Sequence, residues 1–322
     1  GKVALAAVGA STPIINMLIG FFMGISTGAG VVIAQFFGAG NTCKMKRAIH
    51  NSIALTLVMG VVLTIVGLLF NDPILKAIGV PSEVFSEAST YLSIYFWSLI
   101  FVMVYNMGSG ILRSVGDSKR PLYFLIFSSV VNIILDFLFV KYFHFGVAGA
   151  GYATLIAQAI SAIMVMYVLM KTEDDYKVIL KEIGFDKEIL LKIIKIGLPT
   201  GFQQSIVSLS NVIVQSYINV YGASVIAGYS VTIKIDGFVN LPLQAFNMAI
   251  TTFVGQNIGA KQYDRVKKGA YITTALATLT IACFVVIMYF FGRDFIALFN
   301  QEKDVIDAGR LMQLTFLPFY IV

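Results

Sequence analysis

Charged residues are scarce in this sequence, at 12% of 322 residues. A water-soluble domain carries about 25%, because its surface must be hydrated. With about half that share, an ordinary soluble domain is excluded, and most of the outer surface must face something other than water. Hydrophobic residues make up 58% of the chain and the mean hydropathy is +0.85. Lipid is therefore the expected surrounding.

Cysteine and histidine are also few. The two cysteines, Cys43 and Cys283, are far apart in the chain, so neither a disulfide nor a metal site is indicated. The two histidines, His50 and His144, lie apart at expected helix ends, which does not support an intramembrane histidine relay. No Ser/His/Asp set, metal-ligand cluster or nucleotide motif appears. We expect that the chain is not an enzyme and has no cofactor other than an ion.

Long apolar runs dominate what is present. A helix needs about 20 mostly apolar residues to cross the ~30 Å hydrocarbon core of a bilayer. The runs are continuous and show no alternation of period two, which excludes a β-barrel. They predict an all-α polytopic membrane protein. The expected helices cover residues 10–36, 49–70, 88–112, 121–142, 149–170, 193–219, 225–257 and 269–292, with a ninth beginning near 308.

Basic residues gather in alternate loops. These loops hold 16 of the 23 lysines and arginines, whereas the opposite set holds Lys76, Lys141, Arg293 and Lys303. Lys and Arg accumulate in cytoplasmic loops, so the richer set is expected inside. The net charge of +6 thus reflects membrane topology and not nucleic-acid binding. We expect a multi-pass protein of the cell membrane, the inner one where there are two, with the bilayer as its partner.

One long polar stretch interrupts the apolar runs. Residues 171–195 carry six basic and six acidic residues with helical periodicity. The pattern predicts a cytoplasmic linker helix over residues 171–192 that joins two bundles. An amphipathic helix on the membrane surface is the alternative.

The chain repeats itself at a constant offset of 221 residues. VVIAQFFGAG at 31–40 is echoed by FVGQNIGAK at 253–261, so that Gln35 matches Gln256 and Gly38 matches Gly259. The matches at polar positions and in loops disfavour chance similarity. Five helices separate the two copies of the first repeated helix, and the outside-to-inside direction of that helix implies another before it. Two parallel six-helix lobes result, at residues 1–170 and 193–322. Parallel repeats often place the substrate site between the halves.

Fifteen of the 17 acidic residues lie in loops or at helix ends, and the exceptions are Asp136 and Asp236. An ionisable group in the hydrocarbon costs about 3 kcal/mol or more, so it usually has a task. Asn132 lies one helical turn before Asp136, on the same face. A carboxylate and an amide carbonyl are hard oxygen ligands, suited to a small metal cation such as Na⁺ or, at the carboxylate, to a proton. A structural aspartate bonded to a neighbouring helix is the alternative.

Asp236 follows Lys234 by two residues, so their side chains point to different faces of a helix. They either line a polar vestibule or are satisfied by neighbouring helices. A polar stripe also opens the second half of the chain. Candidate residues of a substrate cavity are Asp236, Gln203, Gln204, Gln35 and Gln256.

Several stretches together carry a family resemblance: ALAAVG, VVIAQFFGAG, ILRSVGDSKRP, NIILDFLFV with GVAGAGYATLIAQ, IGLPTGFQQ and FVGQNIGAKQYDRV. In this order they resemble the multidrug and toxic compound extrusion (MATE) family of the bacterial kind. The family has twelve helices in two six-helix lobes. The resemblance implies that this chain holds helices two to six and seven to ten, the last incomplete. It would be a fragment without the first helix and the last two to three.

The resemblance also implies a function. Family members export amphipathic, often cationic, organic compounds by Na⁺ or H⁺ antiport, with alternating access between the lobes. The coupling residues matched here are Asn132, Asp136 and Thr154, while a further acid on the first helix falls outside the chain. Some branches place a glutamate where this chain has Val207, which puts that second acidic site in doubt. We expect such an efflux transporter, acting as a monomer on small organic molecules.

Two other functions remain open. A lipid-linked oligosaccharide flippase of the same superfamily favours a strongly cationic cavity, for which this sequence offers only Lys234. A channel requires a continuous polar lining or filter, which the sequence does not supply. A membrane scaffold without transport activity is the remaining alternative.

Overall fold

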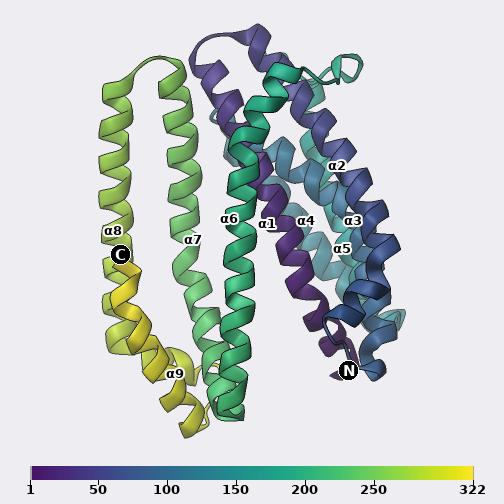
Figure 1. Cartoon of the computed structure of the whole chain (residues 1–322), viewed down its shortest axis with the longest axis vertical. Helices are drawn as coiled ribbons and strands as arrows, with labels where there is room; N and C mark the ends of the chain where they lie inside the picture. Colours follow the sequence, from purple (N-terminus) through teal and green to yellow (C-terminus); the bar gives the residue numbers. More distant parts are fainter. Residues whose placement is uncertain (1, 322) are drawn as a thin grey trace. The chain divides into compact units, whose positions relative to one another are not determined.

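The computed structural model describes the backbone of residues 2–321, without side chains for residues 2–6, 8–11, 13, 212, 219, 223 and 321. The described residues form helices and turns and no strand, which confirms the predicted all-α class (Figure 1). The α-helices are α1 (Lys2–Gly38), α2 (Thr42–Ala77), α3 (Ser82–Ser114), α4 (Lys119–Asp136), α5 (Gly146–Lys171), α6 (Lys187–Ile218), α7 (Ala223–Gly259), α8 (Tyr263–Ala297) and α9 (Lys303–Phe316). Four short helices complete them: the π-helix η1 (Phe137–Tyr142) and the 3₁₀-helices η2 (Leu180–Glu182), η3 (Asn219–Tyr221) and η4 (Leu317–Ile321).

Six of the described helices are long and apolar enough to cross a membrane. They are α1 from Ile14, α2, α3, α4 with η1, α5, and α8 extended to Phe299. We predicted that α6 and α7 also span the membrane. Both have the length, but α6 carries Gln203 and Gln204, and α7 carries Lys234 and Asp236. Their membrane crossing stays a prediction.

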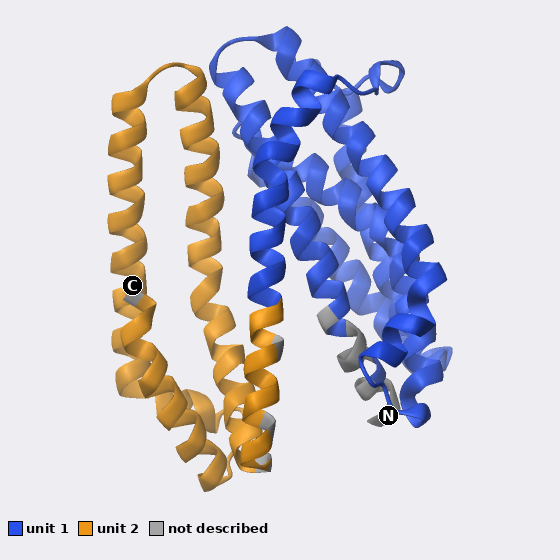
Figure 2. Ribbon diagram, in the orientation of Figure 1, with its two compact units in different colours: residues 1–208 blue, residues 209–322 orange. Residues whose placement is uncertain are grey.

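The chain forms two compact units, residues 1–208 and 209–322, with the boundary inside α6 (Figure 2). In the first unit α3 packs against α1, α2 and α5. Its buried face supplies large core side chains, among them Phe96, Leu99 and Met103. In the second unit α7 packs against α8 and α9. The predicted lobe boundaries at 170 and 193 differ from this division and stay a prediction.

Glycines allow the first half of α6 to approach α1. A Cβ atom added at Gly24 would lie 2.1 Å from the backbone nitrogen of Gly201, and one at Gly28 would lie 2.5 Å from that of Gly197. Such backbone contact is possible only without side chains, and small residues serve this purpose in membrane helices. Gly24 and Gly28 therefore serve helix packing in the GISTGAG stretch of α1.

The helices reproduce the sequence repeat. The bounds of α1 and α7 are both 221 residues apart, from Lys2 to Ala223 and from Gly38 to Gly259. The starts of α8 and α9 follow those of α2 and α3 at the same interval. The turn after the first repeated helix also recurs, since Gly40 (φ 64°) and Lys261 (φ 58°) both adopt the left-handed conformation. A lysine accepts this rare conformation at the place where the first copy has glycine.

The two copies link their second and third helices differently. In the first copy Asn71 of α2 donates hydrogen bonds to Ser89 of α3. Gly292 stands at the equivalent place in the second copy. There Arg310 of α9 donates to the Met288 carbonyl oxygen of α8 at 2.8 Å. The polar link is kept, but its donor has moved to the other helix.

The predicted linker helix over residues 171–192 is wrong for residues 172–186, which we name the connector. Figure 1 shows the connector as the teal loop that leads into α6, and η2 is its one helical turn. Two of its backbone donors bond to other elements instead of to the preceding turn. Val178 donates to the last turn of α5 at 2.8 Å, and Ile179 donates to the Nε2 atom of His50 at 2.9 Å. These tertiary bonds replace the helix that the periodicity predicts.

Candidate functional site

Asp136 is the last residue of α4, and Asn132 lies one turn before it on the same face. Both residues are partly buried. The Oδ1 atom of Asp136 and the Nδ2 atom of Asn132 are shielded from solvent and have no hydrogen-bond partner among the described residues. Most buried polar groups in proteins are paired, so two neighbouring exceptions require an explanation. An unpaired carboxylate oxygen in a membrane helix fits a site for a cation.

The helix widens directly after Asp136. Residues Phe137–Tyr142 form a π-helix, and Phe143 donates to the carbonyl oxygen of Leu138 at 3.0 Å, five residues back. Single π turns occur often at functional sites. We did not predict this turn, because its sequence, FLFVKY, reads as an ordinary apolar helix. It places Asp136 at a junction between two helical geometries.

Tyr91 of α3 lies within electrostatic reach of Asp136. Sequence reasoning missed it, since 45 positions separate the two residues and nothing in the pattern relates them. A phenol can donate a hydrogen bond to a carboxylate. Tyr91 is therefore a side chain outside α4 that can respond to the charge of Asp136.

Thr154 lies on α5, which packs against α4. Its hydroxyl donates to the carbonyl oxygen of Ala150 at 3.0 Å, within its own helix. A hydroxyl that donates in this way keeps its oxygen lone pairs as acceptors. Among the described side chains, no hydrogen bond joins Thr154 to Asp136. The place of Thr154 in the coupling site stays a prediction.

Asp236 and Lys234 of α7 point to different partners. The carboxylate of Asp236 accepts a hydrogen bond from the hydroxyl of Tyr320. The ammonium group of Lys234 lies 5.9 Å from the ring centroid of Phe299. This confirms that the two charges are not a pair. The Tyr320 bond fits the alternative in which neighbouring elements satisfy Asp236, and its place in a cavity stays a prediction.

The four candidate glutamines are distributed over both units. Gln35 on α1 is partly buried, and Gln203 and Gln204 on α6 are exposed. Gln256 is partly buried on α7, in the other unit. Whether they line one cavity is therefore still a prediction. Among the described residues there is no group of three His, Cys, Asp or Glu side chains that could hold a metal ion.

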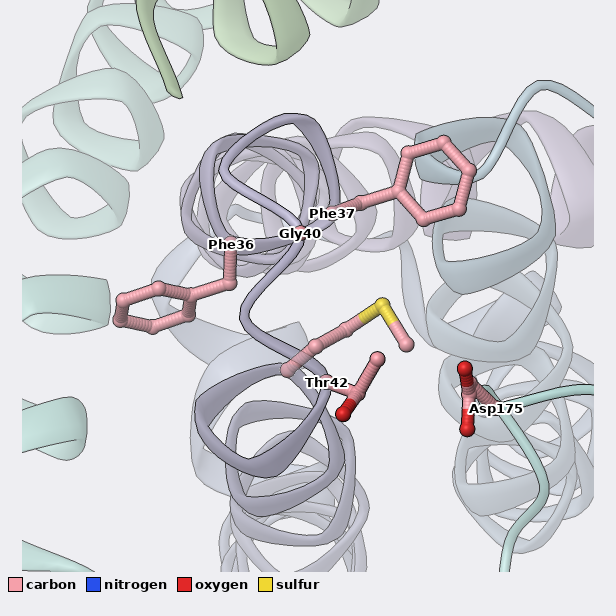
Figure 3. Close-up of a pocket in the computed structure, with 6 residues that line it drawn as sticks. Phe36, Phe37, Gly40, Thr42 and Asp175 are labelled. Carbon is pink, nitrogen blue, oxygen red and sulfur yellow. The ribbon is translucent and has the colours of Figure 1, made fainter. Parts of the chain in front are cut away.

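A cavity of about 180 Å³ lies at the turn between α1 and α2 (Figure 3). The rings of Phe36 and Phe37 point to opposite sides of this turn, and Asp175 of the connector faces Thr42. Gly40 and Met45 complete the lining. None of the predicted site residues lines the cavity.

Comparison with known proteins identifies the family. The sequence model of the MatE family matches residues 1–138 and 199–322, most of the chain. The chain belongs to the MatE family. It is 31% identical to the probable multidrug resistance protein YoeA of Bacillus subtilis (strain 168), over all of this chain and 71% of that protein. It is 28% identical to the probable multidrug resistance protein YpnP of the same organism, over 99% of this chain and 71% of that protein.

A solved MATE structure has the same fold. It is described as the outward-facing conformation of a multidrug resistance MATE family transporter of the MOP superfamily. The TM-score is 0.93 at 25% sequence identity, over all of this chain and 72% of that chain. The predicted family and fold class are confirmed, and the MatE chain is a multi-pass α-helical membrane protein of a transporter family.

Proposed function

We propose that this MatE protein exports amphipathic, often cationic, organic compounds in exchange for Na⁺ or H⁺, which binds at Asp136. The observation that carries the proposal is the buried, unpaired Oδ1 atom of Asp136 next to the unpaired Nδ2 atom of Asn132. A desolvated carboxylate needs a counter-charge, and a transported cation supplies one.

The pair suits either ion. A proton on Asp136 neutralises the carboxylate outright. Na⁺ requires oxygen ligands, and rotation of the Asn132 amide by half a turn places its carbonyl oxygen where the Nδ2 atom lies. In this proposal, the hydroxyl oxygen of Thr154 is the third ligand of Na⁺, beside the Asp136 carboxylate and the Asn132 carbonyl oxygen. Loading and release then follow from alternating exposure of Asp136 to the two sides of the membrane.

The substrate class rests on the relatives and on the composition. Two relatives are named as multidrug resistance proteins. Phenylalanine, tyrosine and methionine number 26, 15 and 12 in this chain. Aromatic faces attract organic cations, and thioethers adapt to varied shapes. The parallel repeat supplies two halves that can move against each other, as in other transporters built from repeats.

Transport of a fluorescent cationic dye tests this function. Proteoliposomes receive either a Na⁺ gradient at constant pH or a pH gradient without Na⁺. Under one of these two ion gradients, we expect the dye to be transported in the direction opposite to the flow of the ion. Dye transport should stop when an ionophore dissipates that ion gradient. Dye movement at the rate of protein-free liposomes in both gradients would reject the proposal in favour of a flippase or a scaffold.

A further inference from the structure

The connector is bound at the depth of the membrane interface. The apolar run Ile53–Phe70 of α2 is about 27 Å long as a helix, close to the thickness of the hydrocarbon core. His50, which accepts the N–H of Ile179, lies three residues before this run. The side chain of Asn51 donates to the carbonyl oxygen of Asp186 at 2.8 Å. Both bonds hold the connector about one helical turn from the hydrocarbon, on the side that the basic loops predict to be cytoplasmic.

A hydrogen bond to helix α5 independently places the connector at the same distance from the end of an apolar run. The N–H of Val178 donates to the carbonyl oxygen of Leu169 at 2.8 Å. Leu169 lies in the last turn of a membrane-spanning helix, one residue before its apolar run ends at Met170. The connector is thus held next to the ends of two apolar runs, those of α2 and α5.

Apolar side chains of the connector divide into two groups. Val178, at 2% exposed, packs into the core of the first unit together with Tyr176 and Ile183. Leu180 and Phe185 point outward, at 63% and 54% exposed. In water such exposure is unfavourable, whereas at an interface the same side chains enter the boundary of the acyl chains.

The charged side chains of the connector also divide into two groups, and the first group is the acids that pair with bases of the protein. The Oδ1 atom of Asp175 lies 3.3 Å from the ammonium group of Lys46 on α2. The Oδ2 atom of Asp186 lies 3.7 Å from the guanidinium of Arg47. Two of the connector's acids are thus held by bases of the neighbouring helix.

One more acid, Asp174, has its own partners. Hydrogen bonds from the hydroxyls of Tyr176 and Thr172, and then the charge of Arg120, lower the pKa of Asp174. The Oε2 atom of Glu182 lies 3.9 Å from the Nε2 atom of His50, but that nitrogen accepts the N–H of Ile179 and carries no proton, so it does not neutralise Glu182.

Three lysines have no such partner. Lys177, Lys181 and Lys187 form no ion pair with any carboxylate in the part of the chain that the structure describes. Of the connector's acids, Glu173 and Glu182 are exposed without a positively charged partner among the described residues. The outward surface therefore combines two large apolar side chains with three unpaired lysines, which outnumber Glu173 and Glu182. This is the composition of segments that bind the anionic cytoplasmic leaflet.

We propose that the connector anchors the protein to the membrane interface. Leu180 and Phe185 enter the acyl-chain boundary. Lys177 and Lys181 of the connector bind anionic lipid headgroups together with Lys187, the first residue of α6. Asp186 also accepts the N–H of Ile189 at 3.2 Å, within the first turn of α6. The anchor thereby fixes the depth at which α6 begins.

Tryptophan fluorescence measures this insertion. The single tryptophan, Trp97, is replaced by phenylalanine, and Phe185→Trp places the probe in the connector. The protein is reconstituted in nanodiscs of phosphatidylglycerol whose acyl chains carry bromine near the headgroup. We expect the probe to lose about half of its emission to the bromine and to resist quenching by aqueous iodide. Leu180→Trp is a second probe with the same expectation.

Glu173→Trp is the matched control, because this exposed residue lies in the same connector and faces no described partner. Iodide should quench it and bromine should not. Replacing the three lysines by glutamine should reduce bromine quenching of the Phe185→Trp probe about fivefold or more in phosphatidylglycerol and leave it unchanged in phosphatidylcholine. An iodide-accessible probe at positions 180 and 185 would overturn the anchor. Protection from both quenchers would also overturn it, because a protein partner would then cover the connector.

Discussion

Asp136→Asn is expected to abolish ion-driven efflux of a cationic dye, with a loss of about 100-fold, while the protein still folds and inserts into the membrane. Asparagine keeps the shape of the side chain, with an NH₂ donor in place of one carboxylate oxygen. It removes the negative charge, so the site neither holds a proton nor attracts Na⁺. The rate of dye efflux from proteoliposomes under the driving gradient measures the loss.

Asp236→Asn is the control for this substitution, because it also removes a carboxylate from a long helix. Asp236 has a partner in Tyr320, whereas the Oδ1 atom of Asp136 has none among the described residues. The Asp236 variant should therefore keep its ion dependence, even if its dye affinity changes. Ion-driven efflux retained by Asp136→Asn would contradict the assignment of the coupling site.

Gly67→Ala is expected to lower the free energy of unfolding by about 3 kcal/mol. A Cβ atom at this position of α2 would lie 2.2 Å from the Cδ1 atom of the Phe96 ring on α3. Phe96 is 1% exposed and belongs to the core of the first unit, so the ring has no space into which it can move. Thermal unfolding in detergent, followed by the loss of the monodisperse chromatographic peak, measures the effect.

Gly60→Ala lies on the same face of α2, two turns earlier, and provides the comparison. Its Cβ atom would lie 3.0 Å from the Cγ1 atom of Ile100, a partly exposed aliphatic side chain that can move. The midpoint temperature of thermal unfolding should fall much less for Gly60→Ala than for Gly67→Ala. Equal midpoints for the two variants would contradict the rigid contact at Phe96.

The repeat and the number of helices could be predicted from sequence, because both depend on long apolar runs and on a constant offset. Helix ends could not. The run predicted over 49–70 lies inside α2, which extends from Thr42 to Ala77. Hydrophobicity marks the hydrocarbon, whereas polar residues such as Lys44 and Arg47 continue the helix into the headgroup region and beyond.

The connector and the proposed coupling site show where sequence reasoning stops. Helical periodicity failed over residues 172–186, because His50, 129 positions before Ile179, accepts a backbone bond that a helix would need. Asp136 and Asn132 were found because a charge within an apolar run is conspicuous. Their lack of partners and the π turn after them depend on packing and backbone geometry, which leave no pattern in the sequence. Tyr320, 84 positions from Asp236, was missed for the same reason.

Ion release on substrate binding shows whether Asp136 holds the coupling ion. The protein is placed in nanodiscs without any gradient, a cationic dye is added, and released protons or displaced radioactive Na⁺ are counted against bound dye. We expect about one ion released per dye bound by the unmodified protein. Asp136→Asn should bind dye and release none. Equal release from the protein and this variant would show that the ion is held elsewhere.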